Sequence, residues 1–164
     1  MCATDPERTS FVAEHTIHVV AGALFDAAGR VLVAQRPPGK HMAGGWEFPG
    51  GKLEPGEDRW HGLQRELREE LGVEAISGRP VIAYDHDYPR RRTHLDLWLV
   101  TEFSGVPRSM EGQPLQWLQL EALKEAGLLE ADWPMIRALQ VAVATVGSRE
   151  SGDGSRQYDG IRKE

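Results

Sequence analysis

Three glutamates, Glu66, Glu69 and Glu70, stand at positions i, i+3 and i+4 of the chain. On a helix this spacing makes the carboxylates neighbours, and each like-charged pair costs roughly 0.2–0.5 kcal/mol. A divalent cation would relieve the repulsion, and carboxylate oxygens suit Mg²⁺ or Mn²⁺, which proteins commonly bind together with substrate phosphates. The alternative is a solvated helix face on which Arg65 and Arg68 balance the glutamates. The triplet alone leaves both interpretations open.

The surrounding residues predict the helix that would carry these carboxylates. Between residues 58 and 71, apolar residues recur at spacings of three and four, at Trp60, Leu63, Leu67 and Leu71. Gly72 follows as a C-terminal stop signal. This pattern predicts an amphipathic helix that buries its leucines and leaves its carboxylates accessible.

The sequence on both sides of the triplet favours the metal site. From Gly51 the chain reads GKLEPGEDRWHGLQRELREELGV, which fits the pattern G-x5-E-x7-R-E-U-x-E-E-x-G-U, where U is apolar. The fit has seven named residues, each with a background frequency of about 5–7%, so a chance match at one position is rarer than roughly one in 10⁸. This segment resembles the Nudix box, the signature of the Nudix hydrolases.

The resemblance extends beyond the box. The stretches GKHMAGGWEFPGGKLEPGE, DYPRRRTHLDLWLV, EGQPLQWLQL and EADWPMIRAL are similar to the MutT-type branch, the 8-oxo-dGTP diphosphatases, over about residues 20–139. In that family a loop, a helix and a loop bind Mg²⁺, for which Mn²⁺ can substitute, and nucleoside diphosphates linked to another moiety are hydrolysed. The expected function is therefore hydrolysis of 8-oxo-dGTP to 8-oxo-dGMP and pyrophosphate, which removes an oxidised precursor before DNA replication and so supports DNA repair.

The resemblance also implies roles for individual residues. The expected metal ligands are the Gly50 carbonyl and four carboxylates, from Glu66, Glu69, Glu70 and Glu111. Glu57 would pair with Arg65 and brace the helix. Either Glu66 or Glu111 would take the proton from the attacking water, and the sequence does not decide between them.

The candidate substrate-binding residues are Arg36, Glu47, Phe48, Tyr88 and Asp132. Arg36 could instead be a surface arginine at a strand end, and the two aromatic residues could be ordinary core. The run 90–92 is expected to be a solvated loop, with an approach to the substrate phosphates as the alternative. Arg90 stands where the 8-oxo-dGTP enzymes commonly have an acidic residue. The histidines show no spacing typical of a zinc site and are interpreted as structural or exposed.

Asp132 leaves the preferred base open. The 8-oxo-dGTP enzymes typically place an asparagine there, which both donates to and accepts from the base, whereas an ionised aspartate only accepts. An aspartate could accept hydrogens from the amino group of cytosine, as in the cytidine-nucleotide pyrophosphohydrolases of the same branch. A CTP- or dCTP-type or broad specificity is therefore the alternative, as is a helix cap without contact to substrate. A catalytically silent nucleotide-binding module is less consistent with an intact box.

Composition restricts the partners. The 164 residues carry 19 basic and 25 acidic side chains, a net charge of −6, so a nucleic-acid polymer is not expected as a ligand. The lone cysteine, Cys2, cannot form an intrachain disulfide, and no segment is apolar enough for a signal peptide or a membrane span. A cytoplasmic monomer without membrane contact is expected. No G-x-x-x-x-G-K-[ST] motif occurs, which excludes P-loop chemistry.

The elements predict one α+β domain, an α/β/α sandwich in which helices flank a mixed sheet. The expected strands are 16–25 and 30–35, which would form a hairpin, and 73–84, 93–103 and 115–118; the expected helices are 58–71, 120–126 and 132–146. The domain would span residues 15–146, between a flexible segment at 1–14 and a disordered polar tail at 147–164. Gly62 is expected to loosen the helix over 58–71 without touching the ligands.

Overall fold

A computed structural model describes residues 16–89 and 91–150, the last five by their backbone only. The expected flexible segment 1–14 and most of the expected tail lie outside the described residues. The elements in chain order are β1 (Ile17–Ala23), β2 (Val31–Gln35), β3 (Trp46–Glu47), β4 (Gly50–Lys52), α1 (Arg59–Leu71), β5 (Glu74–Tyr88), β6 (Arg91–Ser104), β7 (Leu115–Leu118), the 3₁₀ turns η1 (Leu120–Ala122) and η2 (Glu130–Asp132), and α2 (Trp133–Glu150).

The strands form two sheets. The larger sheet has the order β4-β1-β6-β5, in which β1 runs parallel to β6 and the other pairs are antiparallel. The smaller sheet has the order β3-β2-β7 and is antiparallel. The expected α+β class with a mixed sheet and flanking helices is confirmed.

The expected hairpin between residues 16–25 and 30–35 is wrong in its pairing. The turn forms as expected, since Asp26 Oδ1 accepts from the N–H groups of Ala28 and Arg30. Beyond the turn only the isolated bridge between Phe25 and Val31 joins the two segments, because β1 and β2 then enter different sheets. Alternating apolar residues indicate a strand but do not identify the strand that pairs with it.

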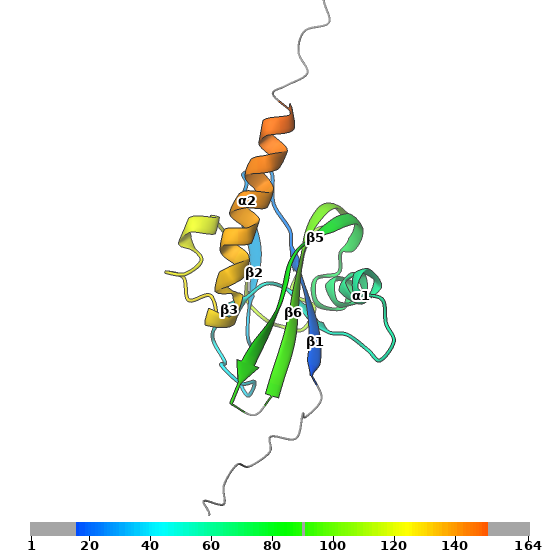
Figure 1. Cartoon of the computed structure of the whole chain (residues 1–164), viewed down its shortest axis with the longest axis vertical. Coiled ribbons are helices and arrows are strands. Elements are labelled where there is room, and N and C mark those ends of the chain that lie inside the picture. The colour runs from blue at the N-terminus through cyan, green and yellow to red at the C-terminus, as the bar shows by residue number, and fades with distance from the viewer. Residues whose placement is uncertain (1–15, 90, 151–164) are drawn as a thin grey trace, which may run out of the picture.

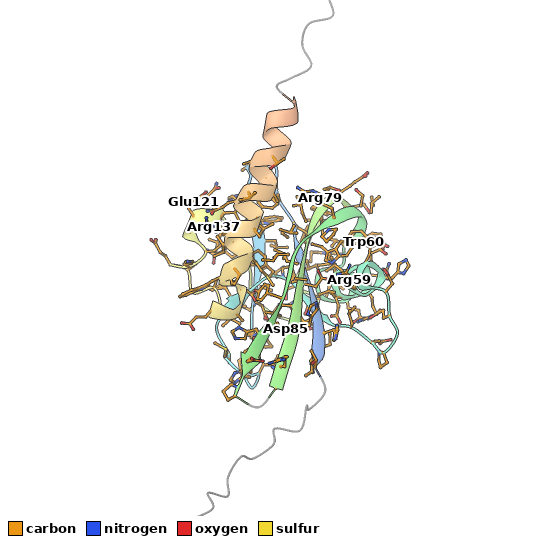
Figure 2. All side chains as sticks on the ribbon, viewed as in Figure 1. Arg59, Trp60, Arg79, Asp85, Glu121 and Arg137 are labelled. Atoms are coloured by element: carbon orange, nitrogen blue, oxygen red, sulfur yellow. The ribbon has the colours of Figure 1, made fainter. Side chains whose placement is uncertain are left out.

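The helices cover opposite faces of the larger sheet, as Figure 1 shows for α1 and α2 on either side of β5 and β6. Consecutive residues of a strand point to opposite faces, so Val20 packs against the leucines of α1 while Ala21 belongs to the cluster that contains Met135 and Leu139 of α2. Figure 2 shows Arg59 and Trp60 at the beginning of α1 and Arg137 on α2, on the two sides of the sheet. In the part of the chain that the structure describes, no helix is long and apolar enough to cross a membrane.

The C-terminal end of α1 matches the sequence signal, and the structure adds a cap at the N-terminal end. Asp58 caps the N-terminus by accepting from the N–H groups of Trp60 and His61, and Gly72 ends the helix in a left-handed conformation with φ of 66°. Leu63, Leu67 and Leu71 are fully buried. Residues 120–126 form a short 3₁₀ turn instead of the expected helix, and α2 runs to Glu150 instead of ending at residue 146.

Gly62 lies in a tight contact. A Cβ atom at this position would lie 2.2 Å from Leu53 Cδ2 and 2.9 Å from Glu57 Oε2. The glycine therefore allows the loop before α1, including Glu57, to pack closely against the helix. Glu57 is not one of the expected metal ligands, so this contact does not contradict the expectation that Gly62 touches no ligand.

Gly50 lies even closer to its neighbours. Its φ is 151°, and a Cβ atom would lie 2.1 Å from the Val20 carbonyl oxygen and 2.8 Å from Ala21 Cα. Both are backbone atoms of the adjacent strand β1, so neither can move away without displacing the strand. Only glycine permits this approach of β4 to β1.

We expect Gly50→Ala to destabilise the fold by at least about 2 kcal/mol, lowering the Tm in thermal unfolding by about 4 °C or more. Gly56→Ala is the matched control, because Gly56 also has a positive φ, 78°, but a Cβ atom there has no neighbour within 4 Å. Its loss should be confined to backbone strain of about 1–2 kcal/mol. Equal losses in the two variants would contradict the importance of the close approach.

Candidate active site

A cavity of about 540 Å³ opens on the face of the larger sheet opposite α1. It is bounded by residues of β1, β4 and β6, by the end of α1 and by loops. Most of the candidate site residues line it: Arg36, Glu47, Phe48, Gly50, Glu66, Tyr88, Glu70, Glu111 and Asp132. Residues separated by nearly a hundred positions in the chain therefore share one cavity.

Glu66 and Glu70 reach the cavity from adjacent turns of α1. The Gly50 N–H donates to Glu70 Oε2 at 3.1 Å. Burial is the largest cause that raises the pKa of Glu70, to about 7, and the negative charges of Glu66, Glu111 and Glu47 raise it further. Burial likewise raises the pKa of Glu66, against the lowering effect of Arg65. These carboxylates are close enough to repel one another.

Arg65 organises the outer side of this carboxylate group. Its Nε and Nη2 atoms donate to the two carboxylate oxygens of Glu57, both at 2.9 Å, and Nη2 also donates to the Lys52 carbonyl at 3.0 Å. Nη1 donates to Glu66 Oε1 at 2.8 Å. Hydrogen bonds from Arg65 lower the pKa of Glu57 to about 2. Arg65 thus ties the loop before α1 to the helix and holds Glu66 in place.

Glu69 is the exception among the four carboxylates. Its side chain is 56% exposed and lies 3.6 Å from Arg65 Nη1, and it does not line the cavity. The carboxylates of Glu66 and Glu69 thus both contact Arg65, and they do not converge with the Glu70 carboxylate on one position. In residues 16–89 and 91–150, no three carboxylate, histidine or cysteine side chains converge to hold one ion. The donor chemistry nevertheless fits a hard divalent cation, since the carboxylates of Glu66, Glu70 and Glu111 face one cavity. The charges of Glu66 and Glu111 add to the effect of burial in raising the pKa of Glu70.

Glu111 reaches the cavity from the loop between β6 and β7. Gln113, which is 6% exposed, holds this loop and was not among the residues predicted from the sequence. The side chain accepts from the Glu111 N–H and donates to the Glu70 carbonyl. A glutamine two positions from a candidate ligand carries no recognisable signal in one sequence, because its partner is 43 positions away.

The other end of the cavity holds a second charged group. Arg36 Nε donates to Glu47 Oε2 at 2.7 Å, and Arg36 Nη1 donates to the His41 carbonyl at 2.9 Å. Burial raises the pKa of Glu47, although Arg36 opposes the shift. Arg36 is therefore a cavity residue with a fixed orientation and not a free surface arginine.

Asp132 lies at this same end and is buried. Its Oδ2 accepts from the Phe48 N–H at 3.4 Å, and no hydrogen bond to the first turn of α2 occurs among the described residues. Burial raises its pKa to about 7, helped by the charge of Glu47. Phe48 itself is 4% exposed and belongs both to the core and to the cavity wall. The structure thus favours a cavity role for Asp132 over the helix cap.

The described residues of the basic run are exposed as expected, but they lie in a strand and not in a loop. Arg91 and Arg92 begin strand β6, and their side chains diverge. Arg91 lines the cavity and stacks over Tyr88, with 5.2 Å from its Cζ to the ring centroid, whereas Arg92 pairs with Asp87 outside it. Arg90 lies outside the described residues. His41, expected to be structural or exposed, is exposed but lines the cavity and contacts Tyr88 edge to face.

The chain matches a family model described as NUDIX domain over residues 20–138. The chain belongs to the Nudix family. Nudix hydrolases act on nucleotide substrates and generally use a divalent metal, for which the carboxylates described above are suitable donors.

Individual relatives of this Nudix hydrolase cover most of the domain. It is 43% identical to a CTP pyrophosphohydrolase of Escherichia coli over 122 residues, 74% of this chain and 90% of the relative. It is 44% identical to an 8-oxo-dGTP diphosphatase of Proteus vulgaris over 96 residues, 58% of this chain and 86% of the relative. The solution structure of the Escherichia coli ORF135 protein superposes with a TM-score of 0.70 at 40% identity, covering 79% of this chain and 92% of that one.

The raised pKa of Glu70 predicts how stability depends on pH without metal. Because the pKa is about 7 in the folded chain and near 4.5 ordinarily, ionisation of Glu70 costs stability as the pH rises from about 4.5 to 7. Glu70→Gln removes this cost. In a chelator, we expect this variant to melt a few degrees above the unsubstituted protein at pH 8 and at about the same temperature at pH 5.

Glu69→Gln is the matched control for this measurement, because it removes the same charge one position away from a half-exposed side chain. Its effect on the Tm should be much smaller than that of Glu70→Gln. A Tm difference for Glu70→Gln that does not change between pH 5 and pH 8 would contradict the raised pKa.

Proposed function

We propose that the protein is a Mg²⁺-dependent nucleoside triphosphate pyrophosphohydrolase whose principal substrate is 8-oxo-dGTP, converted to 8-oxo-dGMP and pyrophosphate. The observation that carries this proposal is one cavity whose wall combines two kinds of residue. Glu66, Glu70 and Glu111 are carboxylates suited to a metal, and Phe48, Tyr88 and Asp132 are suited to contact with a base. We assign the first group to the phosphate end of a nucleotide and the second group to its base end.

At the phosphate end, the ligands for Mg²⁺ would be the Gly50 carbonyl and the carboxylates of Glu66, Glu69, Glu70 and Glu111. Bound there, Mg²⁺ or Mn²⁺ supplies neutralisation of the phosphate oxygens and of the leaving group. Lys40, Lys52 and Arg91 add positive charge along the cavity wall. The net charge of −6 is no obstacle to an anionic substrate when cations are supplied locally.

The proton of the attacking water needs an acceptor near the phosphate. Glu66 and Glu111 are the two candidates, and both line the cavity. Burial raises the pKa of Glu66, which makes it a stronger base than an ordinary carboxylate, and its bond to Arg65 fixes its orientation. Glu57 acts through Arg65 and is a positioning residue.

At the base end, Asp132 can supply what an asparagine supplies. A protonated carboxyl group both donates and accepts, while an ionised one only accepts. With its pKa raised to about 7, a large share of Asp132 is neutral near neutral pH. Oδ2 already accepts from Phe48, so Oδ1 is the atom left for a base. Phe48 and Tyr88 would enclose the ring, and Arg36 with Glu47 would border it.

A cytidine nucleotide is the second candidate substrate. Two observations favour it: an aspartate stands at position 132, and a relative named CTP pyrophosphohydrolase is 43% identical over 90% of its own length. The amino group of cytosine can donate to a carboxyl group in either protonation state, and more strongly to the ionised one.

The remaining expectations complete the proposal. The protein would act as a cytoplasmic monomer that removes oxidised nucleotides ahead of DNA replication. Nucleic-acid polymers and membranes would not be partners. The catalytic domain would span residues 15–146, and deletion of residues 147–164 would change neither the Tm nor turnover appreciably.

Pyrophosphate release from a panel of nucleoside triphosphates, measured with and without Mg²⁺, tests the activity. We expect Mg²⁺-dependent turnover with the highest kcat/KM for 8-oxo-dGTP. Glu69→Gln and Glu70→Gln should each lower turnover by about a hundredfold or more at saturating Mg²⁺, because each removes a metal ligand. Near-normal turnover in either variant would exclude that residue as a ligand, and no turnover of any nucleotide would favour a silent binding module.

Asp132→Asn tests the reading of the base. The amide donates at every pH, so the ratio of kcat/KM for 8-oxo-dGTP to that for dCTP should rise at least several-fold at pH 8. For 8-oxo-dGTP, kcat/KM of the unsubstituted enzyme should fall relative to the variant as the pH rises through about 7, because Asp132 then loses its donor. Titration of other groups cancels in this comparison. An unchanged ratio would return the choice of base to Phe48, Tyr88 and Arg36.

A further inference from the structure

Gln113 is a buried polar residue in an otherwise exposed part of the loop between β6 and β7. Its side chain is 6% exposed, while Glu111, Gly112 and Pro114 are all exposed. Burying an amide is unfavourable unless its hydrogen bonds are made. The hydrogen bonds of Gln113 therefore show which parts of the structure this buried side chain connects.

Both atoms of the Gln113 amide are used. Oε1 accepts from Ser109 Oγ at 2.9 Å and from the Glu111 N–H at 3.1 Å, while Nε2 donates to the Glu70 carbonyl at 3.1 Å. One side chain thus bridges the backbone of two candidate metal ligands, Glu70 on α1 and Glu111 on the loop. The same amide oxygen closes the loop upon itself through Ser109.

The backbone of the loop makes its own contacts with the end of α1. The N–H groups of Arg108 and Met110 donate to the carbonyls of Leu71 and Glu70 at 2.9 and 3.0 Å. These bonds hold the loop before Glu111 but not after it. Gly112 follows with φ of 81°, a conformation that glycine adopts without strain, and the chain turns at this residue.

Glu111 therefore depends on Gln113 for its position. Among the described residues, the Glu111 N–H bonds only to Gln113 Oε1, and the Glu111 carboxylate makes no hydrogen bond or ion pair. The Met110 N–H bond to the Glu70 carbonyl attaches the residue before Glu111 to α1, and the Gln113 amide holds the Glu111 N–H itself. Loss of the amide would leave the ends of the loop attached and its central residue free to move.

We propose that Gln113 is a positioning residue that sets the Glu111 carboxylate opposite Glu66 and Glu70 through its simultaneous bonds to Glu111 and Glu70. This inference rests on the proposed function, because it assigns Glu111 a part in metal binding and turnover. A displacement of about 1 Å in a reacting group can lower turnover by about a hundredfold. Substitution of Gln113 should therefore approach the effect of losing Glu111 itself.

A double-mutant cycle tests the coupling. Gln113→Met keeps the length of the side chain and removes both polar atoms, and Glu111→Gln removes the carboxylate charge. We expect Gln113→Met to lower kcat by about ten- to a hundredfold and to weaken Mn²⁺ binding, measured by calorimetry without nucleotide, several-fold. In the Glu111→Gln background, Gln113→Met should change neither quantity further.

Two controls separate positioning from stability. Gln119→Met makes the same change at an exposed glutamine whose side chain makes no hydrogen bond in the described residues, and it should leave kcat unchanged. Ser109→Ala removes one bond of Gln113 and preserves those to Glu111 and Glu70, so it should lower kcat by less than about threefold. If Gln113→Met does not fold, Gln113→Asn keeps the amide on a chain too short to span both partners and should show the same coupling.

The outcomes distinguish this inference from the proposed function. If Glu111→Gln retains normal kcat and Mn²⁺ affinity, the assigned role of Glu111 fails and the inference fails with it. If Glu111→Gln is impaired but Gln113→Met is normal, only the inference is overturned. Equal effects of Gln113→Met with and without Glu111 would likewise overturn it, because a general structural defect acts independently of Glu111.

Discussion

Two consecutive glycines determine how closely three elements approach one another at the active site. A Cβ atom at Gly50 would lie 2.1 Å from a carbonyl oxygen of β1, and one at Gly51 would lie 2.2 Å from Glu66 Oε2 on α1. Without side chains at these positions, β4 lies against β1 on one side and beneath the carboxylates of α1 on the other. The Gly50 N–H can then reach Glu70, and Glu66 lies beside the strand. A larger residue at position 50 would push β4 away from β1, and one at position 51 would displace the Glu66 carboxylate from the place where a metal ligand is expected.

This close approach concentrates negative charge. Glu47, Glu66, Glu70, Glu111 and Asp132 line one cavity in a chain that already carries a net charge of −6. The raised pKa values of Glu70 and Asp132 express the cost of that concentration. Arg65 and Arg36 offset part of it, since each holds a glutamate of the cavity in an ion pair. A cavity of this kind is suited to a ligand that brings its own cations to the phosphate end and a neutral base to the other.

The two helices contribute differently to this arrangement. α1 supplies ligands from one face and leucines from the other, so its packing and its chemistry are fixed together. α2 supplies core contacts, and the turn that precedes it places Asp132 below Phe48. The loop that carries Glu111 is attached to the end of α1, so the carboxylates of helix and loop are held by a common support.

The amino-acid sequence by itself determined the features that depend on near neighbours in the chain. The helix over 58–71, its Gly72 end, the buried leucines and the spacing of Glu66, Glu69 and Glu70 all follow from local pattern. The Nudix identity follows from the same segment.

Only the tertiary structure decided which distant residues meet. Strand pairing separated β1 from β2, and the alternation of side chains along β6 turned Arg91 into the cavity and Arg92 away from it. The tertiary structure also buries Asp132, brings Glu69 close to Arg65 and places Gln113 between Glu70 and Glu111. Register, burial and electrostatic environment arise from contacts between segments far apart in the chain, and a local pattern carries no record of them.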